Sequence, residues 1–252
     1  AFTRFTYFYD ALNANKNSTE FRDLSKKAVD QVGRDIDLLD AYVYGNTDVF
    51  GRRVDARVGR QVMNWGESTF IPNGINAINP VDLSALRVPG SELREGLLPV
   101  EAVDLNAQLS DNLSIEGFYQ LLWHETKLDA TGTYFSTSDI AAPGGNNVYL
   151  GYGSVLVPDN PAFNGPTAVC PLGCRVARSG TDTPKDEGQF GVAMRYFAPW
   201  LNDTEFGVYG MQYHSRVPVI NAHTGTLAGL LGGNFAASSR YNLEYPEDIK
   251  LG

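Results

Sequence analysis

The sequence predicts an all-β protein, an antiparallel transmembrane β-barrel with long extracellular loops. Seven segments alternate apolar and polar residues, the period of a strand with one face in each environment. The 252 residues include 26 Gly, 13 Tyr and 13 Phe, a composition that suits strands and turns. The connections between the segments alternate strictly between long and short. A soluble β-sandwich with a dry core has the same residue alternation, and it stays open as an alternative.

Composition excludes several other classes of protein. There are 20 Lys and Arg against 29 Asp and Glu, a net charge of −9, so no nucleic-acid partner is expected. Mean hydropathy is −0.22, and no segment approaches the ~20 consecutive apolar residues that a membrane helix needs. Charged residues are only 19% of the chain, which argues against a disordered protein.

The predicted strands are mostly long enough to cross a membrane when tilted, which takes ~9–11 residues. The clearest two form a hairpin around Ser110-Asp111-Asn112. A second hairpin is predicted to turn through Asn46-Thr47-Asp48. In chain order the strands are Phe2–Tyr9, Leu38–Gly45, Val54–Val62, Val100–Leu109, Leu113–Trp123, Gln189–Phe197 and Glu205–Tyr213.

The predicted connections are typical of an outer-membrane barrel, which has short periplasmic turns and longer extracellular loops. Short ones fall at about 46–53, 110–112 and 198–204, and long ones at about 10–37, 64–99, 124–188 and after 214. Bacterial barrels usually have an even number of strands, so seven strands, the last of which runs into a loop, are not expected to close a barrel. Residues 1–252 are therefore expected to form the N-terminal portion of one barrel domain in a longer protein, or the ordered part of such a protein.

The alternation also assigns the two faces of the strands. An Arg or Lys that faces lipid at mid-membrane costs ~2–4 kcal/mol, so the polar set is expected to face the lumen. The predicted lumen residues are Asp55, Arg57, Gln61, Asp104, Asn106, Glu116, Gln120 and Arg195. The predicted lipid-facing residues are Val54, Val58, Leu105, Leu109, Ile115, Leu121, Val192 and Met194. Aromatic girdles are expected at Tyr119, Trp123, Tyr196 and Trp200.

The connection 64–99 is predicted to fold into the lumen as a plug or constriction. Pro72-Asn73-Gly74 and Asn79-Pro80 are turn signals within it, and Val81–Leu86 is expected to make a helical turn. Its charged residues are expected to pair with strand residues such as Arg57, Arg60 and Glu116. The alternative is a surface loop that caps the barrel rim. The predicted constriction residues of this segment are Trp65, Glu67, Asp82 and Arg87.

Cys170 and Cys174, spaced C-x3-C, lie in the long connection 124–188. In an oxidising compartment this spacing favours a local disulfide over a metal or redox pair. Aromatic residues of the same connection could line a vestibule for an apolar solute or pack the loop's own core, and both interpretations stay open. These residues are Tyr134, Phe135, Tyr149, Tyr152 and Phe163.

No catalytic, metal or cofactor site is predicted. Gly66-Glu67-Ser68-Thr69-Phe70 is not the G-x-S-x-G motif of hydrolases. The three histidines, His124, His214 and His223, are expected to be solvated loop residues rather than metal ligands.

The segment 57–70, RVGRQVMNWGESTF, continues into NGINAINPVD at 73–82 and LRVPG at 86–90. It resembles the signature of the domain-of-unknown-function 1302 family, with further matches at 112–120, 132–137 and 241–249. The resemblance covers nearly the whole chain. It implies a large secreted protein of Gram-negative bacteria, about twice this length, that forms a barrel in the bacterial outer membrane. No catalytic residues come with this family.

The resemblance also implies a function. Genes of this family often lie beside those of RND-type permeases, which implies transport or binding of hydrophobic small molecules, sterol-like or hydrocarbon-like. The implied partners are outer-membrane lipid, a periplasmic carrier and an RND-type permease. One alternative is a plugged structural or surface-interaction barrel without a transport role. Another is a soluble periplasmic β-protein, which would be extracted without detergent.

Overall fold

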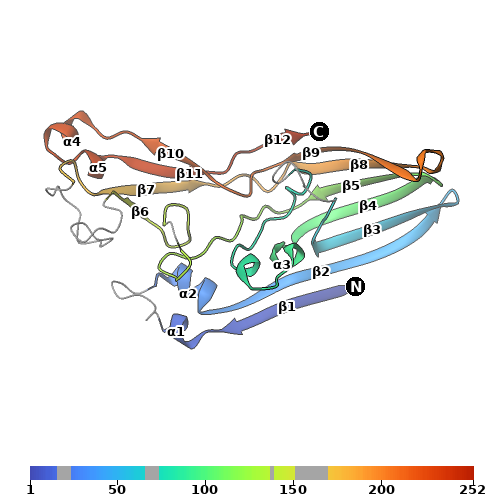
Figure 1. The fold of residues 1–252 in the computed structure, drawn as a ribbon, viewed down its shortest axis with the longest axis horizontal. Helices are drawn as coiled ribbons and strands as arrows, with labels where there is room; N and C mark the ends of the chain where they lie inside the picture. The colour runs from blue at the N-terminus through green and yellow to red at the C-terminus, as the bar shows by residue number, and fades with distance from the viewer. Residues whose placement is uncertain (16–23, 66–73, 137–138, 151–169) are drawn as a thin grey trace.

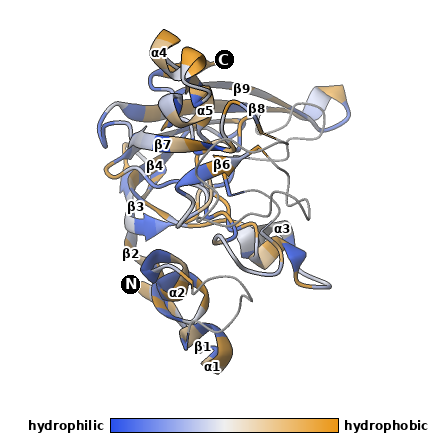
Figure 2. Ribbon diagram, turned by 90° about the vertical axis from the view of Figure 1, so that its left-hand side faces the viewer, coloured by the Kyte–Doolittle hydropathy of each residue, from blue (hydrophilic) through white to orange (hydrophobic). Residues whose placement is uncertain are grey.

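The largest unit of the protein is an eight-stranded antiparallel sheet that curves into a half-barrel (Figures 1 and 2). The computed structural model describes residues 1–15, 24–65, 74–136, 139–150 and 170–252. Within them, β1 and β12 are the edges of this sheet. The strands, in spatial order, are β1 (Phe2–Tyr9), β2 (Arg34–Val49), β3 (Arg52–Gln61), β4 (Val100–Ser110), β5 (Leu113–Gln120), β8 (Gln189–Ala198), β9 (Thr204–Tyr213) and β12 (Ile249–Leu251).

All seven predicted strands are present, with some differences in their ends. The β2–β3 turn is made by Phe50 and Gly51, both with positive φ (52° and 73°), rather than by the Asn46-Thr47-Asp48 turn that was expected. The two strands are therefore longer than predicted. The three short turns, β2–β3, β4–β5 and β8–β9, all lie at one end of the sheet, at the right of Figure 1. This arrangement confirms the alternation of short and long connections.

A second, four-stranded sheet lies at the other end of the molecule and was not predicted. It consists of β6 (Asn147–Tyr149), β7 (Arg175–Asp182), β10 (Val219–His223) and β11 (Arg240–Glu244), in the order β10-β11-β7-β6. The β11–β7 pair is parallel, unlike its neighbours. The connection 124–188 is thus not wholly a loop, since it supplies β6 and β7.

The helices are short and lie in the connections. They are α1 (Ala11–Ala14), α2 (Lys26–Val32), α3 (Leu93–Gly96), α4 (Leu227–Leu231) and α5 (Phe235–Ser238), with 3-10 turns η1 (Ala85–Arg87) and η2 (Pro199–Leu201). The expected helical turn near Asp82 is η1, and the Asp82 carboxylate accepts hydrogen bonds from the backbone N–H groups of Ser84 and Ala85. No helix in the described ranges is long and apolar enough to cross a membrane.

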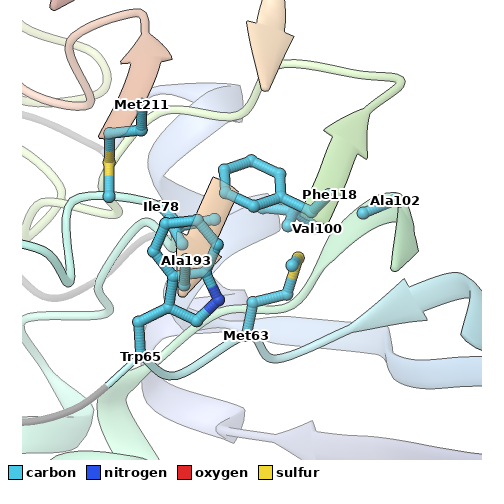
Figure 3. Packing of buried hydrophobic residues seen from close by; sticks show 8 residues of the cluster. All are labelled: Met63, Trp65, Ile78, Val100, Ala102, Phe118, Ala193 and Met211. Atoms are coloured by element: carbon cyan, nitrogen blue, oxygen red, sulfur yellow. The ribbon is translucent and has the colours of Figure 1, made fainter. Parts of the chain in front are cut away.

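The two faces of the large sheet differ in polarity. On the outer face, apolar side chains from successive strands stay exposed, for example Leu105 at 50% and Val208 at 64%. The main core lies on the inner face, where the chain that follows β3 packs against the sheet (Figure 3). The cluster consists of Met63, Trp65, Ile78, Val100, Ala102, Phe118, Ala193 and Met211. In a sandwich the outer apolar face would be covered, whereas here its side chains remain accessible.

A substitution at Gly59 tests the pairing of β2 with β3. Gly59 has φ +131°, and a Cβ built on it would lie 2.3 Å from the Ala41 carbonyl oxygen of β2. We expect Gly59→Ala to lower the free energy of unfolding by about 1–3 kcal/mol, because the backbone must shift. The urea midpoint measures this. Gly45→Ala is the matched control, since a Cβ there would meet nothing within 4 Å. Equal midpoints for the two variants would contradict the β2–β3 register.

Candidate functional site

The inner face of the half-barrel carries a belt of paired charges. Arg57 of β3 lies directly opposite Asp104 of β4, and its Nη2 is 2.7 Å from Asp104 Oδ2. Arg195 of β8 reaches Glu116 of β5, with Nη1 2.7 Å from Glu116 Oε2. Asp104 and Glu116 are nearly buried. Burying a carboxylate is costly unless it is paired, so the two arginines make these positions possible.

A third pair, Arg53 with Asp55, lies toward the short-turn end of the same face. It is more exposed than the other two, so its contribution to stability is small. Asp55 faces Asn106 in the β3–β4 register. The three predicted carboxylates Asp55, Asp104 and Glu116 each have an arginine partner, which leaves the belt close to electrically neutral.

Trp65, seen beside Phe118 in Figure 3, attaches the predicted plug segment to this belt. Its side chain is 3% exposed, and its Nε1 donates to Glu116 Oε1 at 2.9 Å. The indole packs on Phe118 and Tyr209, with ring centroids 5.1 and 5.9 Å away. A Cβ at Gly191 would come within 2.7 Å of both Trp65 and Phe118. Because Gly191 has no side chain, it leaves the space that the Trp65 indole occupies.

Two further side chains hold the same segment on the sheet. The Asn79 amide accepts from the Met63 N–H at 3.2 Å and donates to the Met63 carbonyl. Arg216, which follows β9, donates to the Ile78 carbonyl at 2.9 Å and to Gln120 Oε1 at 2.6 Å. Burial lowers the pKa of the Arg216 guanidinium to about 10. The beginning of the segment is therefore fixed to the inner face by both hydrogen bonds and packing.

The far half of the segment makes its contacts elsewhere, contrary to the expected pairing with Arg57 and Arg60. Asp82 lies 4.0 Å from Lys127, which is also 3.1 Å from Asp37, and Arg87 pairs with Asp129. Burial lowers the pKa of Lys127, but the hydrogen bond that its ammonium donates to Asp37 and the charges of the neighbouring carboxylates outweigh burial and raise the pKa. Lys127 and Asp129 follow β5, whereas Asp37 belongs to β2. The described part of the segment therefore extends across the inner face of the sheet.

Arg60 belongs to a different cluster, at the long-connection end of the outer face. Its Nη1 lies 2.9 Å from Glu101 Oε1, and His124 Nε2 lies 2.6 Å from Glu101 Oε2. Arg60 shares the register side of Val58, whereas Arg57 faces inward. Among the described residues, Arg60 therefore pairs with its neighbour in the sheet, Glu101, and not with the plug segment.

The structure brings most predicted site residues together but not all. Asp55, Arg57, Gln61, Asp104, Glu116 and Arg195 share the inner face, and Trp65 contacts it. Asp82 and Arg87 lie apart from that belt, and Glu67 lies outside the described residues. Sequence reasoning missed Asn79, Gly191, Arg216 and Lys127 as determinants of the site. Only Asn79 had a signal, its place before Pro80 in a turn.

One other expectation is wrong, and a further residue makes contacts that the sequence did not predict. His214 is fully buried instead of solvated, since its Nδ1 accepts from the Asp248 N–H at 3.0 Å and its Nε2 lies 2.8 Å from the Glu187 carbonyl oxygen. Trp123, expected in an aromatic girdle, lies just beyond the end of β5, where it packs edge-on against Tyr245 and donates to the Ser215 carbonyl. The partners of both residues lie far away in the sequence, so a position near a strand end does not predict these contacts.

Of the aromatic residues in connection 124–188, Tyr134 and Phe135 stack edge to face with centroids 5.0 Å apart and stay exposed. Tyr152 and Phe163 lie outside the described residues. Arg87 lies over the Phe135 ring, 5.3 Å from its centroid. Phe135 thus has a partner in the plug segment, and the vestibule stays a prediction.

A hollow of about 520 Å³ opens on the inner face between β1 and β5. Aromatic side chains of β1 and β2 line one side of it, namely Phe2, Tyr42 and Tyr44. The polar belt lines the other side, through Asp55, Arg57, Asp104, Asn106 and Glu116. In the part of the chain that the structure describes, no group of three or more His, Cys, Asp or Glu side chains is placed to hold a metal ion.

These features define a class of β-protein, one with a half-barrel sheet that is polar and filled by a connection on its inner face and apolar on its outer face. The chain belongs to the family described as protein of unknown function DUF1302, whose family model matches all of residues 1–252. This confirms the resemblance found in the sequence. Neither a curated protein nor a solved structure matches the chain.

Trp65→Phe tests how the plug segment is held. The change keeps an aromatic ring on Phe118 but removes the donor to Glu116, a bond worth about 1 kcal/mol. We expect amide hydrogen exchange in residues 74–99 to become about fivefold faster, as measured by mass spectrometry. The matched control is Trp200→Phe, because Trp200 is 75% exposed in the β8–β9 turn. Unchanged exchange in 74–99 would show that this bond does not hold the segment.

Proposed function

We propose that the large sheet is part of the wall of a transmembrane β-barrel in the bacterial outer membrane, and that this barrel transports or binds hydrophobic small molecules. The outer face of the sheet gives the strongest support for the barrel. Its apolar side chains form a band, and charged residues lie at both ends of this band. On β4, the outward row begins at Glu101, continues with Val103, Leu105, Ala107 and Leu109, and is followed by Asp111 in the turn.

The height of this band fits a membrane. From Glu101 to Asp111 is ten residue steps, ~33 Å along the strand, which a tilt of ~40° reduces to ~25 Å. Outer-membrane barrels have an apolar band of ~25 Å. On β3, Arg52 and Arg60 bound the shorter row Val54, Ala56 and Val58 in the same way. Lipid chains as the neighbour of this face explain why it is apolar and uncovered.

Aromatic residues lie near both limits of the band. Tyr196 faces Phe206 toward the short-turn end, and Tyr119 faces Phe190 toward the other end. All four side chains are at least 38% exposed. Girdles of this kind occur at both interfaces of membrane barrels.

The inner face suits a passage that a connection narrows. Its constriction would be lined by Asp55, Arg57 and Glu116 together with the segment 64–99. The hydrophobic cargo, the periplasmic carrier and the RND-type permease rest on the family resemblance rather than on this geometry. A plugged structural barrel is the second candidate, favoured by the contacts that Trp65 and Arg216 make across the inner face.

Leu105→Arg distinguishes a lipid neighbour from water. At mid-band in lipid the change should cost about 2–4 kcal/mol of folding free energy, measured by urea titration in phospholipid vesicles. In a water-exposed sheet it should cost less than about 0.5 kcal/mol. Asn106→Arg is the control at the same depth on the inner face. Equal, small effects of both changes would overturn the barrel proposal.

Cargo transfer tests the transport role directly. Liposomes that contain the protein should pass a labelled hydrocarbon-like probe to acceptor vesicles faster than empty liposomes. Deleting residues 72–88 should also raise permeability to small solutes, because part of the plug segment is lost. Equal transfer with and without the protein would favour the structural alternative, and unchanged solute permeability in the deletion would favour a rim cap.

The disulfide stays part of this proposal. Cys170 and Cys174 form one small buried cluster, and no S–S bond joins them within the described residues. In the oxidising periplasm or at the cell surface we expect the bond to form. Alkylation of the denatured protein with and without reduction, followed by intact-mass measurement, should then differ by two alkyl groups. Equal masses would refute it.

A further inference from the structure

The hollow on the inner face has two chemically different walls. On β1 and β2, the rings of Phe2, Tyr42 and Tyr44 follow one another, with centroids 5.5 Å apart for the first pair and 6.2 Å for the second. Tyr44 lies directly opposite Arg57 in the β2–β3 register, so this aromatic row borders the polar belt. A molecule that rests on the rings is therefore within reach of polar groups.

The polar wall retains hydrogen-bonding capacity. Asn106 lines the hollow, and its side-chain amide makes no hydrogen bond to the residues that the structure describes. Arg57 uses Nε and Nη2 on a single oxygen of Asp104, so the donors on Nη1 are not used in that pair. The other Asp104 oxygen, Oδ1, is buried without a partner among the described residues. Because Asp104 Oδ1 is buried, the acceptor that this wall offers beside the rings is the Asn106 amide oxygen, and the donors are the Asn106 amide nitrogen and Arg57 Nη1.

A purely apolar ligand fits this hollow poorly. It would remove water from Asn106 and Arg57 and return no hydrogen bond, and an unsatisfied polar group costs ~1–3 kcal/mol. A ligand with one hydroxyl group avoids this penalty, since the hydroxyl can donate to the Asn106 amide oxygen and accept from a nitrogen. The volume of about 520 Å³ lies within the ~300–1,000 Å³ of small-molecule sites.

We infer that this hollow binds a ring-shaped amphiphile, that is, an apolar or aromatic ring system that carries a hydroxyl group. The ring lies on Tyr42 and Tyr44, and the hydroxyl group points to Asn106 and Arg57. The inference rests on the proposed function for the cargo's entry into the barrel, and it narrows the cargo from hydrophobic molecules in general to hydroxylated ones.

Two probes that differ by one hydroxyl group test it, naphthalene and 2-naphthol. Their binding to the protein in phospholipid nanodiscs is measured by fluorescence, with partition into protein-free nanodiscs subtracted. We expect 2-naphthol to bind about fivefold more tightly, the effect of one additional hydrogen bond. Asn106→Leu should abolish this difference, because 2-naphthol loses its hydrogen-bond partner and naphthalene no longer removes water from an unsatisfied amide, so naphthalene should bind more tightly than it does to the unchanged protein. Tyr42→Leu combined with Tyr44→Leu should weaken both probes about tenfold.

Tyr119→Leu is the matched control, because Tyr119 is an exposed strand tyrosine on the outer face. It should change neither affinity, and circular dichroism checks that each variant folds. The inference is overturned if naphthalene binds as tightly as 2-naphthol, if Asn106→Leu weakens both equally, or if Tyr119→Leu matches the double variant. Displacement of 2-naphthol by maltose would also overturn it, since the site would then recognise a polyol.

The same titration with detergent-solubilised protein separates this inference from the proposed function. If 2-naphthol is preferred there while Leu105→Arg has no effect in vesicles, the hollow is a binding site but the barrel proposal fails. If Leu105→Arg has its expected cost and the hydroxyl preference is absent, the barrel stands and the amphiphile inference fails.

Discussion

The shared carboxylate of Glu116 is the contact on which the inner face depends. Its two oxygens receive different donors, the Arg195 guanidinium from a neighbouring strand and the Trp65 indole from the segment that follows β3. A nearly buried carboxylate would be costly with neither donor. With both, one side chain fixes the β5–β8 pair and seats the incoming segment. The hydrogen bond to Glu116 fixes the position of the Trp65 indole, and the hydrophobic cluster packs around this indole.

The segment that fills the inner face of the sheet therefore also supplies part of the hydrophobic core of the sheet. Met63, Trp65 and Ile78 contribute to the cluster from outside the sheet, and Phe118, Ala193 and Met211 contribute from within it. A segment that only covered a rim would leave these strand residues in water. The part of the inner face that the segment does not cover is where the aromatic row and the polar belt form the hollow.

The elements predicted correctly are those whose physics is local. A period of two residues determines which side chains share a face, so the long strands and the inward charges of β3, β4, β5 and β8 could be predicted. The second sheet could not, because β6 has three residues and β7, with its Arg-Ser-Gly-Thr run, lacks an apolar face. Arg216 and Lys127 acquire their roles from Gln120 and Asp37, 96 and 90 residues away. No spacing within the sequence records such contacts.

The parallel pairing of β7 with β11 bears on the order in which the chain folds. The β8–β9 hairpin lies between these two strands in sequence, so β7 and β11 meet only after the intervening chain has returned to the same end. Closing so long a loop is slow compared with forming a hairpin. We therefore expect the β7–β11 pair to form after the β8–β9 hairpin, so that the small sheet joins the two ends of a chain segment that is already folded.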